Sequence, residues 1–419
     1  MAARQRTAVA IAVFVLLAIV VVFGRWYETH HARPQAITEK EVLVHVTNAG
    51  DRGPGTLREA LFVVASTNGP ATVSIDVPRI EVETALPALV NGHGVKIRTQ
   101  GAQIAAKGLS SGPVLDVSGP DTTIEGLTIT DCPAAAVLVR AARFRLTGAT
   151  LASCDVGVDV AENASQTLLD RNHFTRNRVG VRFAASGHSS AVTNNEFTDN
   201  KDAGIWAVRS ALDSHDEPIG IHDNKFVEDG TGIVAGNVPV LVERNDFINA
   251  NEADVHLVGG GAVVRGNHIN GGASMGIVAE NAHGDIIEDN ELEGLAAYGV
   301  MVRNSSNIMV RSNRLHNCGY GFAFVLGDAQ GASTAVDNTI IEPKFNGIDV
   351  IGDSPILRRN QVLRPHAFAL HVEDFQPPAG GNKVQSKPFL DNNTFEKPTV
   401  GGKPVVSSSA TATSGARHR

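Results

Sequence analysis

Residues 172–183 read Asn-His-Phe-Thr-Arg-Asn-Arg-Val-Gly-Val-Arg-Phe, and this phrase decides the fold because it returns along most of the chain. Its first half is an Asn followed two residues later by an apolar residue, and its second half is a small residue followed by alternating apolar residues. The intervals between successive Asn residues are 23, 29, 21, 22, 23, 23, 25 and 22. These positions are Asn172, Asn195, Asn224, Asn245, Asn267, Asn290, Asn313, Asn338 and Asn360. A nearly fixed step of this length indicates stacked units that share one core.

The repeated unit is made of short strands. Apolar residues alternate with period two, and Gly, Asn and Asp separate the segments, whereas helical spacing is missing. Two or three strands per step, each pairing with its counterpart one step later, give a coil of parallel strands around a filled interior. A β-propeller is excluded, because its blades need about 40 to 50 residues.

These Asn-x-Phe and Gly-Ile/Val steps resemble the repeats of the right-handed parallel β-helix, or pectate-lyase-like, superfamily over about residues 42–400. The resemblance implies an all-β fold, a single-stranded right-handed parallel β-helix solenoid. The superfamily contains lyases, hydrolases, epimerases, adhesins and non-enzymatic scaffolds, and a fold does not by itself determine a reaction. The resemblance therefore predicts the architecture and leaves enzymatic activity open.

The first 41 residues predict a membrane anchor and a linker. Residues 1–7 carry Arg4 and Arg6, residues 8–24 are apolar, and residues 25–41 are polar. Arginines before an apolar run place the N-terminus in the cytoplasm and predict a single transmembrane helix. A cleaved signal peptide is the other interpretation, and both put residues 42–400 in the periplasm or outside the cell.

A capping helix is predicted over residues 56–66. Thr56 is suited to the N-cap, with Glu59 three residues later. Leu57, Ala60, Leu61 and Val64 would form its apolar face. A helix laid across the first coil would cover its open strand edges, and Arg58 is then expected to make a structural contact.

Charge and composition exclude one class of partner. The net charge is −8 and no basic stripe is present, so we expect no nucleic-acid binding. Residues 401–419 are rich in Gly, Ser, Ala and Thr and predict a disordered tail.

The three cysteines leave two interpretations open. Cys132 and Cys154 lie 22 residues apart, so they should stack about 4.8 Å apart on neighbouring coils. A disulfide would form in an oxidising compartment, and two aligned buried thiols explain the spacing equally well. Some periplasmic metal-maturation proteins of this fold handle copper, but three Cys and four Met do not predict the clustered soft ligands that copper needs.

The alternation of side chains assigns one outward row of residues, the position where ligands usually lie in this architecture. Neighbouring coils bring Asp159, Arg182 and Trp206 about 4.8 Å apart, as an adjacent trio. The row then continues through Val234, His256, Val278, Met301, Ala323, Asp349 and His371, with Glu280, Arg303 and Glu373 two residues further on in their strands.

One long step adds a loop beside this row. The interval from Gly204 to Gly232 is 28 residues, and the excess lies in residues 209–218. The loop carries His215 and three carboxylates, Asp213, Asp216 and Glu217, which are close enough in sequence to form a calcium site. Trp206 precedes the loop, where its ring could stack on a sugar or lie partly buried under the loop.

These residues define the functional prediction. Lyases and epimerases of this fold need a base and a cation beside a uronate carboxylate. Arg182 is the candidate cation, and His215 and His256 are the candidate acid and base. The candidates for ligand binding are Asp159, Trp206, Asp216, Glu280 and Arg303. The sequence lacks the Asp-Pro-His motif of the mannuronan epimerases. We therefore predict a membrane-tethered extracytoplasmic protein that binds a polysaccharide, and we leave open whether it also modifies it as a lyase or epimerase. No cofactor is predicted, and a calcium site stays open. The alternative is a non-catalytic envelope scaffold or adhesin.

Overall fold

The computed structural model of the chain describes residues 40–184, 189–210, 217–272, 275–327, 330–377, 382–400 and 406–408. The chain divides into two units, residues 1–40 and residues 41–419, and the second unit contains all of the described residues except Lys40. The predicted anchor and nearly all of the predicted linker lie outside the described residues. Within the described ranges, no helix is both long and apolar enough to cross a membrane.

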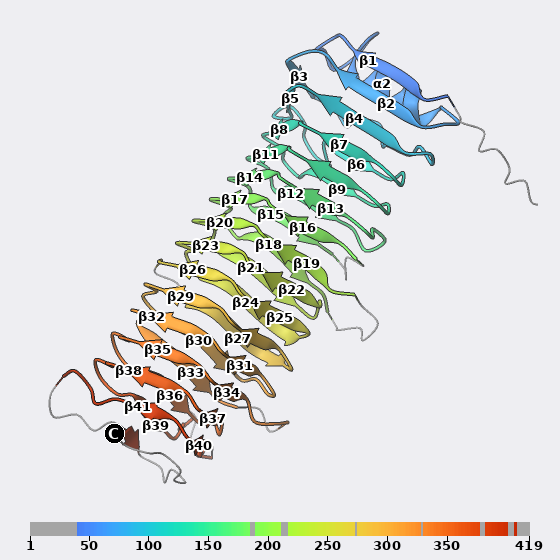
Figure 1. Cartoon of the computed structure of the whole chain (residues 1–419). Helices are drawn as coiled ribbons and strands as arrows, with labels where there is room; N and C mark the ends of the chain where they lie inside the picture. Colours follow the sequence, from blue (N-terminus) through green and yellow to red (C-terminus); the bar gives the residue numbers. More distant parts are fainter. Residues whose placement is uncertain are drawn as a thin grey trace, which may run out of the picture. The chain divides into compact units, whose positions relative to one another are not determined.

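Residues 42–395 form a coil of parallel strands, as the repeat predicted, and from β6 on each full coil adds one strand to each of three long sheets (Figure 1). Successive strands of a sheet come from successive coils and pair in parallel, as in β12 with β15 and β15 with β18. The first sheet contains β1 (Val42–Val46), β2 (Ala71–Ile75), β4 (Val95–Thr99), β7 (Thr123–Glu125), β10 (Arg145–Thr147), β13 (Leu168–Asp170), β16 (Ala191–Thr193), β19 (Ile219–His222), β22 (Val240–Glu243), β25 (Ala262–Arg265), β28 (Ile286–Glu288), β31 (Met309–Arg311), β34 (Thr334–Val336), β37 (Ile356–Arg358) and β40 (Phe389–Asp391).

The second sheet follows the first within each coil. It contains β3 (Arg79–Glu81), β5 (Gln103–Ala105), β8 (Thr128–Thr130), β11 (Thr150–Ala152), β14 (His173–Thr175), β17 (Glu196–Thr198), β20 (Lys225–Val227), β23 (Asp246–Ile248), β26 (His268–Asn270), β29 (Glu291–Glu293), β32 (Arg314–His316), β35 (Thr339–Ile341), β38 (Gln361–Leu363) and β41 (Thr394–Phe395).

The third sheet completes the coil and carries the predicted outward row. It contains β6 (Leu115–Val117), β9 (Ala135–Val139), β12 (Val156–Val160), β15 (Val179–Phe183), β18 (Ala203–Val208), β21 (Thr231–Gly236), β24 (Ala253–Gly260), β27 (Met275–His283), β30 (Tyr298–Arg303), β33 (Tyr320–Val325), β36 (Ile348–Ile351), β39 (Leu370–Glu373) and β42 (Val406–Ser408). We call the bend from the first to the second sheet the first turn, that from the second to the third the second turn, and that from the third sheet to the next coil the third turn.

Part of the core is a stack of phenylalanine rings from successive coils. The Asn-x-Phe steps place Phe174, Phe197, Phe226 and Phe247 inside the coil, with ring centroids 4.8, 4.7 and 4.7 Å apart. The small residue of the repeat leaves room for these rings. At Gly180, an added Cβ would lie 2.8 Å from a ring carbon of Phe197. The two halves of the phrase therefore pack against each other.

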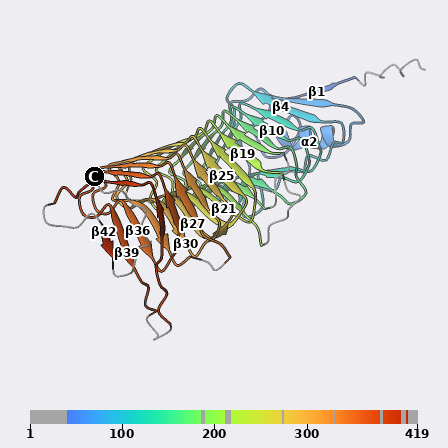
Figure 2. The ribbon, with the colours of Figure 1, turned by 60° about the horizontal axis from the view of Figure 1, so that its bottom comes forward.

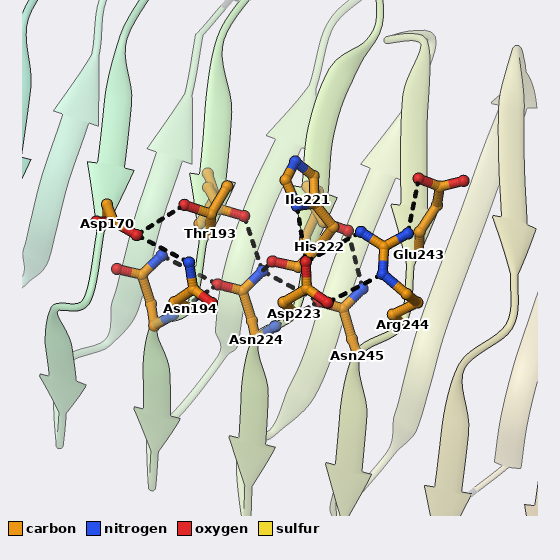
Figure 3. Close-up of polar contacts among 12 residues, drawn as sticks. Asp170, Thr193, Asn194, Ile221, His222, Asp223, Asn224, Glu243, Arg244 and Asn245 are labelled. Atoms are coloured by element: carbon orange, nitrogen blue, oxygen red, sulfur yellow. Dashed lines mark hydrogen bonds and ion pairs between the residues drawn. The ribbon is translucent and has the colours of Figure 1, made fainter.

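An asparagine ladder closes the first turn from Asn172 to Asn393. Asn195 is typical: its backbone N–H and its Nδ2 donate to Oδ1 of Asn224 at 2.9 and 3.0 Å, and Nδ2 also donates to the carbonyl of Leu169 at 2.9 Å. The amide of Asn195 thus satisfies two backbone groups of the preceding coil, the N–H of Asn172 and the carbonyl of Leu169, and bonds the Asn224 side chain of the following coil. Figure 3 shows Asn224 and Asn245 in this ladder, with Arg244 placed between Asp223 and Glu243 on the surface outside it.

Helix α2 (Leu57–Ala65) closes the N-terminal end of the coil (Figure 2). It buries Leu57, Ala60, Leu61 and Val64, as the sequence predicted, and its N-cap is Thr56. Arg58 donates to Asp51 Oδ1 at 2.7 Å and to the carbonyl of Thr84 at 2.9 Å. These are structural contacts that connect the helix to the segment before it and to the loop after β3.

The structure also bears on the predictions for the cysteines and for the C-terminal segment. Cys132 and Cys154 form a disulfide between adjacent coils, so the first of the two interpretations holds in this structure. The strand β42 lies within the segment predicted as a disordered tail and pairs in parallel with β39. Strand pairing with the edge of the third sheet provides order that the composition of this segment alone does not indicate.

Candidate functional site

The outward row predicted from the alternation exists on the third sheet. The register pairs Asp159 with Arg182, Arg182 with Trp206, and Trp206 with Val234. The row then continues through His256, Val278, Met301, Ala323, Asp349 and His371. We call this row and its flanking residues the outer face of the third sheet.

Several residues of the row are buried although the alternation placed them outward. Val234 and Val278 are 7% and 4% exposed, and Ala323 and Asp349 are 0% and 3% exposed. Trp206, in contrast, is 37% exposed, so its ring is available at the surface. The alternation determined on which side of the sheet these residues lie, but whether a neighbour covers them depends on the side chains around them.

The structure brings together the predicted trio at the N-terminal part of the face. Arg182 donates from Nε and Nη2 to the two carboxylate oxygens of Asp159 at 2.8 and 2.5 Å. The paired carboxylate raises the pKa of Arg182, which therefore stays charged. A hollow of about 480 Å³ lies beside this pair and is lined by Leu138, Arg140, Asp159, Ala161, Glu162, Asn163, Arg182 and Ala184.

A second predicted group lies in the middle of the face. Arg303 Nη1 is 3.4 Å from Glu280 Oε1, and His256 Nε2 is 3.5 Å from Glu280 Oε2, the latter contact lacking hydrogen-bond geometry. The register separates Arg182 from His256 by three coil steps, or about 14 Å. These two candidates for a cation and a base therefore do not meet at one reacting atom.

Part of the predicted loop site lies outside the described residues. This part comprises Asp213, His215 and Asp216. Glu217 is exposed and accepts a short hydrogen bond from the Ser189 hydroxyl. In the described part of the chain, no group of three His, Cys, Asp or Glu side chains could hold a metal ion, and the predicted calcium site finds no support there.

The arginines of this face are matched by carboxylates on neighbouring coils. Arg140 pairs with Asp116, and Arg178 lies between Asp155 and Asp202. Arg182 pairs with Asp159 and Arg303 with Glu280. Because each guanidinium already has a carboxylate partner, the face does not offer a row of uncompensated positive charges.

A polar cluster at the C-terminal end of the face was not predicted from the sequence. Asp349 Oδ1 accepts a hydrogen bond of 2.8 Å from Asn346 Nδ2 and lies 3.2 Å from His371 Nδ1. The hydroxyl of Tyr298 also hydrogen-bonds Asp349, and burial with the nearby carboxylate raises the pKa of Tyr298 to about 12. The hydrogen bond with Asp349 raises the pKa of His371.

A sequence signal for this cluster was available in the repeat. Asn393 continues the asparagine ladder, accepting from Asn360 at 2.9 Å, and the interval between the two is 33 residues. This last step is longer than the step of 29 residues from Asn195 to Asn224, which contains the loop at 209–218. The excess lies in residues 374–388, in the third turn after β39, next to His371.

Two family models match parts of the chain. A model described as a right-handed β-helix region matches residues 211–362, and one described as a periplasmic copper-binding protein (NosD) matches residues 92–260. Comparison with curated protein sequences gave no match.

The residues described in the second match do not fit a copper centre. Cys132 and Cys154 are joined in a disulfide, so neither can offer a thiolate. Soft-metal sites need clustered Met, Cys or His ligands, and the described residues contain no metal-binding cluster of three His, Cys or acidic side chains.

Solved structures with low sequence identity share the coil. A tailspike protein of E. coli bacteriophage HK620, in complex with a pentasaccharide, has a TM-score of 0.58 at 10% identity, covering 87% of this chain and 78% of the other. A GH87 α-1,3-glucanase from Streptomyces thermodiastaticus has a TM-score of 0.53 at 13% identity, covering 87% and 70%. A PL6 alginate lyase in complex with a trisaccharide has a TM-score of 0.49 at 12% identity, covering 88% and 87%. Together with the three parallel sheets and the first family model, the first two likenesses show that the chain has the right-handed parallel β-helix fold.

Proposed function

We propose that the outer face of the third sheet binds a polysaccharide outside the cytoplasm. The observation that carries this proposal is an exposed Trp206 next to the Asp159–Arg182 pair and the hollow beside it. Sugar sites combine an apolar ring that stacks on the pyranose with a few polar groups that fix its hydroxyls. The trio supplies the ring and the polar groups together, because Asp159 and Trp206 each lie one coil step from Arg182.

A regular row of outward positions suits a polymer. Its positions repeat about every 4.8 Å along the coil, and the row extends beyond Trp206 to His256, Glu280 and Arg303. An extended chain laid along the sheet would contact several of these positions in turn. The HK620 tailspike, whose structure contains a pentasaccharide, and the α-1,3-glucanase share this fold and support a carbohydrate ligand.

The disulfide supports an extracytoplasmic location. Disulfides persist in oxidising compartments and are rare in the cytosol, and Cys132 and Cys154 are joined across adjacent coils. The matching family model describes a periplasmic protein. Residues 8–24 would then anchor the body at the membrane. Alkaline phosphatase fused after residue 40 should be active in a bacterial host, and an inactive fusion that is still expressed would contradict export.

The proposal concerns binding rather than catalysis. A uronate lyase or epimerase needs a free cation and a base at the same sugar ring, whereas Arg182 is paired to Asp159 and lies three coils from His256. Absorbance of unsaturated products from alginate and pectin tests the lyase version, and NMR of the polymer tests the epimerase version. A protein that binds without product formation agrees with the binding role.

Affinity electrophoresis of the purified full-length protein tests the proposal. Gels containing neutral glucans, alginate, pectin or glycosaminoglycans are compared with a gel without polymer. Trp206→Ala should weaken binding to the retarding polymer about tenfold, as expected for the loss of a stacking ring. Phe62→Ala is the matched control, because Phe62 is 61% exposed on α2, away from the third sheet.

Two outcomes would overturn this function. If no polymer retards the wild-type protein, the alternative of a non-catalytic scaffold is favoured. If a polymer retards Trp206→Ala and the wild type equally, binding takes place on another surface.

A further inference from the structure

The C-terminal end of the outer face carries a carboxylate that is buried although it projects from the sheet outward. Asp349 is 3% exposed and lies between Ala323 and His371 in the row. Three side chains surround it: Asn346, Tyr298 and His371. A buried carboxylate is stable only when hydrogen bonds replace its water. Its contacts hold His371 by the Nδ1 edge of the ring.

This arrangement leaves the other edge of the imidazole for a ligand. The His371 side chain is 24% exposed, and Glu373 Oε2 lies 3.9 Å from Nε2, beyond hydrogen-bond length. A hydroxyl group placed between Nε2 and Glu373 could hydrogen-bond both. Because Asp349 fixes the orientation of the ring, a bound hydroxyl would meet a polar group that is already positioned.

Aromatic rings form one side of the same cluster. Tyr298 stacks on Tyr320 with a centroid distance of 4.5 Å, and Tyr320 stacks on Phe345 at 4.9 Å. Phe345 ends this stack and is 49% exposed. Phe368 lies 5.9 Å from the His371 ring. An exposed apolar ring near an oriented polar edge is the combination that a pyranose needs.

A long third-turn loop borders the cluster. It begins directly after Glu373 and contains an antiparallel bridge between Phe375 and Val384. Lys383 Nζ is 2.8 Å from Asp374 Oδ2, so this cation is matched by a carboxylate within the loop. Like the arginines of the face, Lys383 is therefore already compensated before a ligand arrives.

We propose that Tyr298, Phe345, Asp349 and His371 form a second carbohydrate subsite, which takes an uncharged sugar unit of the polymer held at Trp206. This inference rests on the proposed function and adds the class of ligand, a neutral polysaccharide. A polyuronate would bring one carboxylate per sugar next to Asp349 and Glu373. Lys383, which is paired with Asp374, and the matched arginines of the face could not compensate this charge.

The distance between the two subsites requires a polymer. Seven register steps separate Trp206 from His371, or about 34 Å along the sheet. A single sugar or a disaccharide reaches one subsite, whereas a longer chain engages both and gains from the linkage. Affinity should therefore rise with chain length until both subsites are filled.

The test uses affinity electrophoresis of the full-length protein with dextran and laminarin as neutral probes and alginate as the acidic probe. His371→Gln should weaken retardation by the bound glucan about tenfold, the effect expected when a hydrogen bond from a charged or strongly polar group is lost. The matched control is His316→Gln, because His316 also lies between two carboxylates, Glu293 and Glu342, but on the second sheet. The control should leave the affinity for the glucan essentially unchanged.

A second variant tests the same subsite independently, in case His371→Gln alters the fold. Phe345→Ala removes the exposed ring at the end of the aromatic stack and should weaken binding about fivefold, as for partial loss of stacking. Thermal unfolding of each variant checks that the coil remains intact.

The outcomes separate the two proposals. If Trp206→Ala weakens binding but His371→Gln and Phe345→Ala behave like wild type, the second subsite is wrong and the proposed function stands. If alginate retards the protein more strongly than either glucan, the neutral class is wrong. If none of the polymers retards the wild-type protein, both proposals fall together.

Discussion

The first and second turns of each coil both contain a buried side-chain position, but the two turns fill it with different kinds of residue. In the first turn, a buried position is occupied by Asn in every coil from Asn172 to Asn393, and each amide bonds to the next. In the second turn, the corresponding position changes from coil to coil: Cys132 and Cys154 in a disulfide, then Asn177, Asn200, Asp229, Ala250, Gly272, Leu295 and Cys318.

The difference between the two turns shows which kind of side chain can form a continuous hydrogen-bonded ladder. A side chain that both donates and accepts can repeat indefinitely, and Asn does so. In the second turn the ladder ends at Asp229, because its successor Ala250 has no polar side chain. In the coils without an amide at this position, the second turn is stabilised by apolar packing or, at Cys132 and Cys154, by a disulfide. Four variants test this comparison.

Removing one rung of the first turn should have the largest effect. Asn245→Ala deletes the donor to the Ile221 carbonyl at 2.8 Å and the acceptor for the Asn224 backbone N–H at 3.0 Å. Two buried backbone groups lose their partners, so we expect the free energy of unfolding to fall by about 4 kcal/mol. Urea unfolding followed by circular dichroism measures this change. Lys225→Ala, an exposed change on β20, is the control, and an equal loss in both variants would contradict a special role for the ladder.

Opening the disulfide of the second turn should have the next largest effect. Replacing Cys132 and Cys154 by Ala removes a cross-link over 22 residues, and a closed loop of that size stabilises a folded chain by about 3 kcal/mol. Unfolding of the wild type with and without reductant, compared with the double variant, gives the value. A double variant as stable as the oxidised wild type would show that apolar packing alone suffices at this position.

Restoring an amide at the end of the second ladder should stabilise the protein. Asp229 is 1% exposed, and Oδ2 has no hydrogen-bond partner among the described residues. Burial raises its pKa from 3.8 to about 7. The folded chain therefore holds a proton that the unfolded chain releases. The contribution of Asp229 to stability is greatest below about pH 4, falls as pH rises towards 7 and is constant above it.

Asp229→Asn removes this titration and should raise the free energy of unfolding at pH 8 by about 2 kcal/mol, with a smaller gain at pH 4. Denaturation at the two pH values, on variant and wild type together, gives the difference. Asp285, whose pKa burial raises to about 6, contributes to the pH trend of both proteins and cancels in this difference. A gain that is the same at both pH values would contradict a titrating Asp229.

A surface charge of the first turn should matter least. Arg244 is exposed and lies 3.0 Å from Asp223 and 3.5 Å from Glu243 (Figure 3). Exposed ion pairs contribute little, so Arg244→Ala should lower the free energy of unfolding by about 0.5 kcal/mol. Affinity for any retarding polysaccharide should not change, because the first turn lies away from the outer face of the third sheet. Weakened binding in this variant would indicate that the polysaccharide binds near the first turn, which would contradict a site on the outer face of the third sheet.

The sequence predicted the row of outward positions on the third sheet, and the features of that row that it did not predict have physical causes. The two-residue alternation placed Asp159, Arg182 and Trp206 in one row because strands of neighbouring coils lie in register. It did not anticipate that Asp349 is buried, since its cover comes from Tyr298 two coils earlier and His371 one coil later. Nor did it indicate that each arginine of the face has a carboxylate partner, which depends on side-chain conformation.

By itself, the sequence determined the coil. A phrase repeated about every 22 residues, with Asn at one bend and alternating apolar residues in the strands, has one stable arrangement, in which each strand buries its apolar side against the neighbouring coils. The tertiary structure decided which outward side chains remain available to a ligand. That outcome depends on contacts between coils, because a residue that is outward in its own strand can be covered, paired or left exposed by residues one or two coils away in the chain.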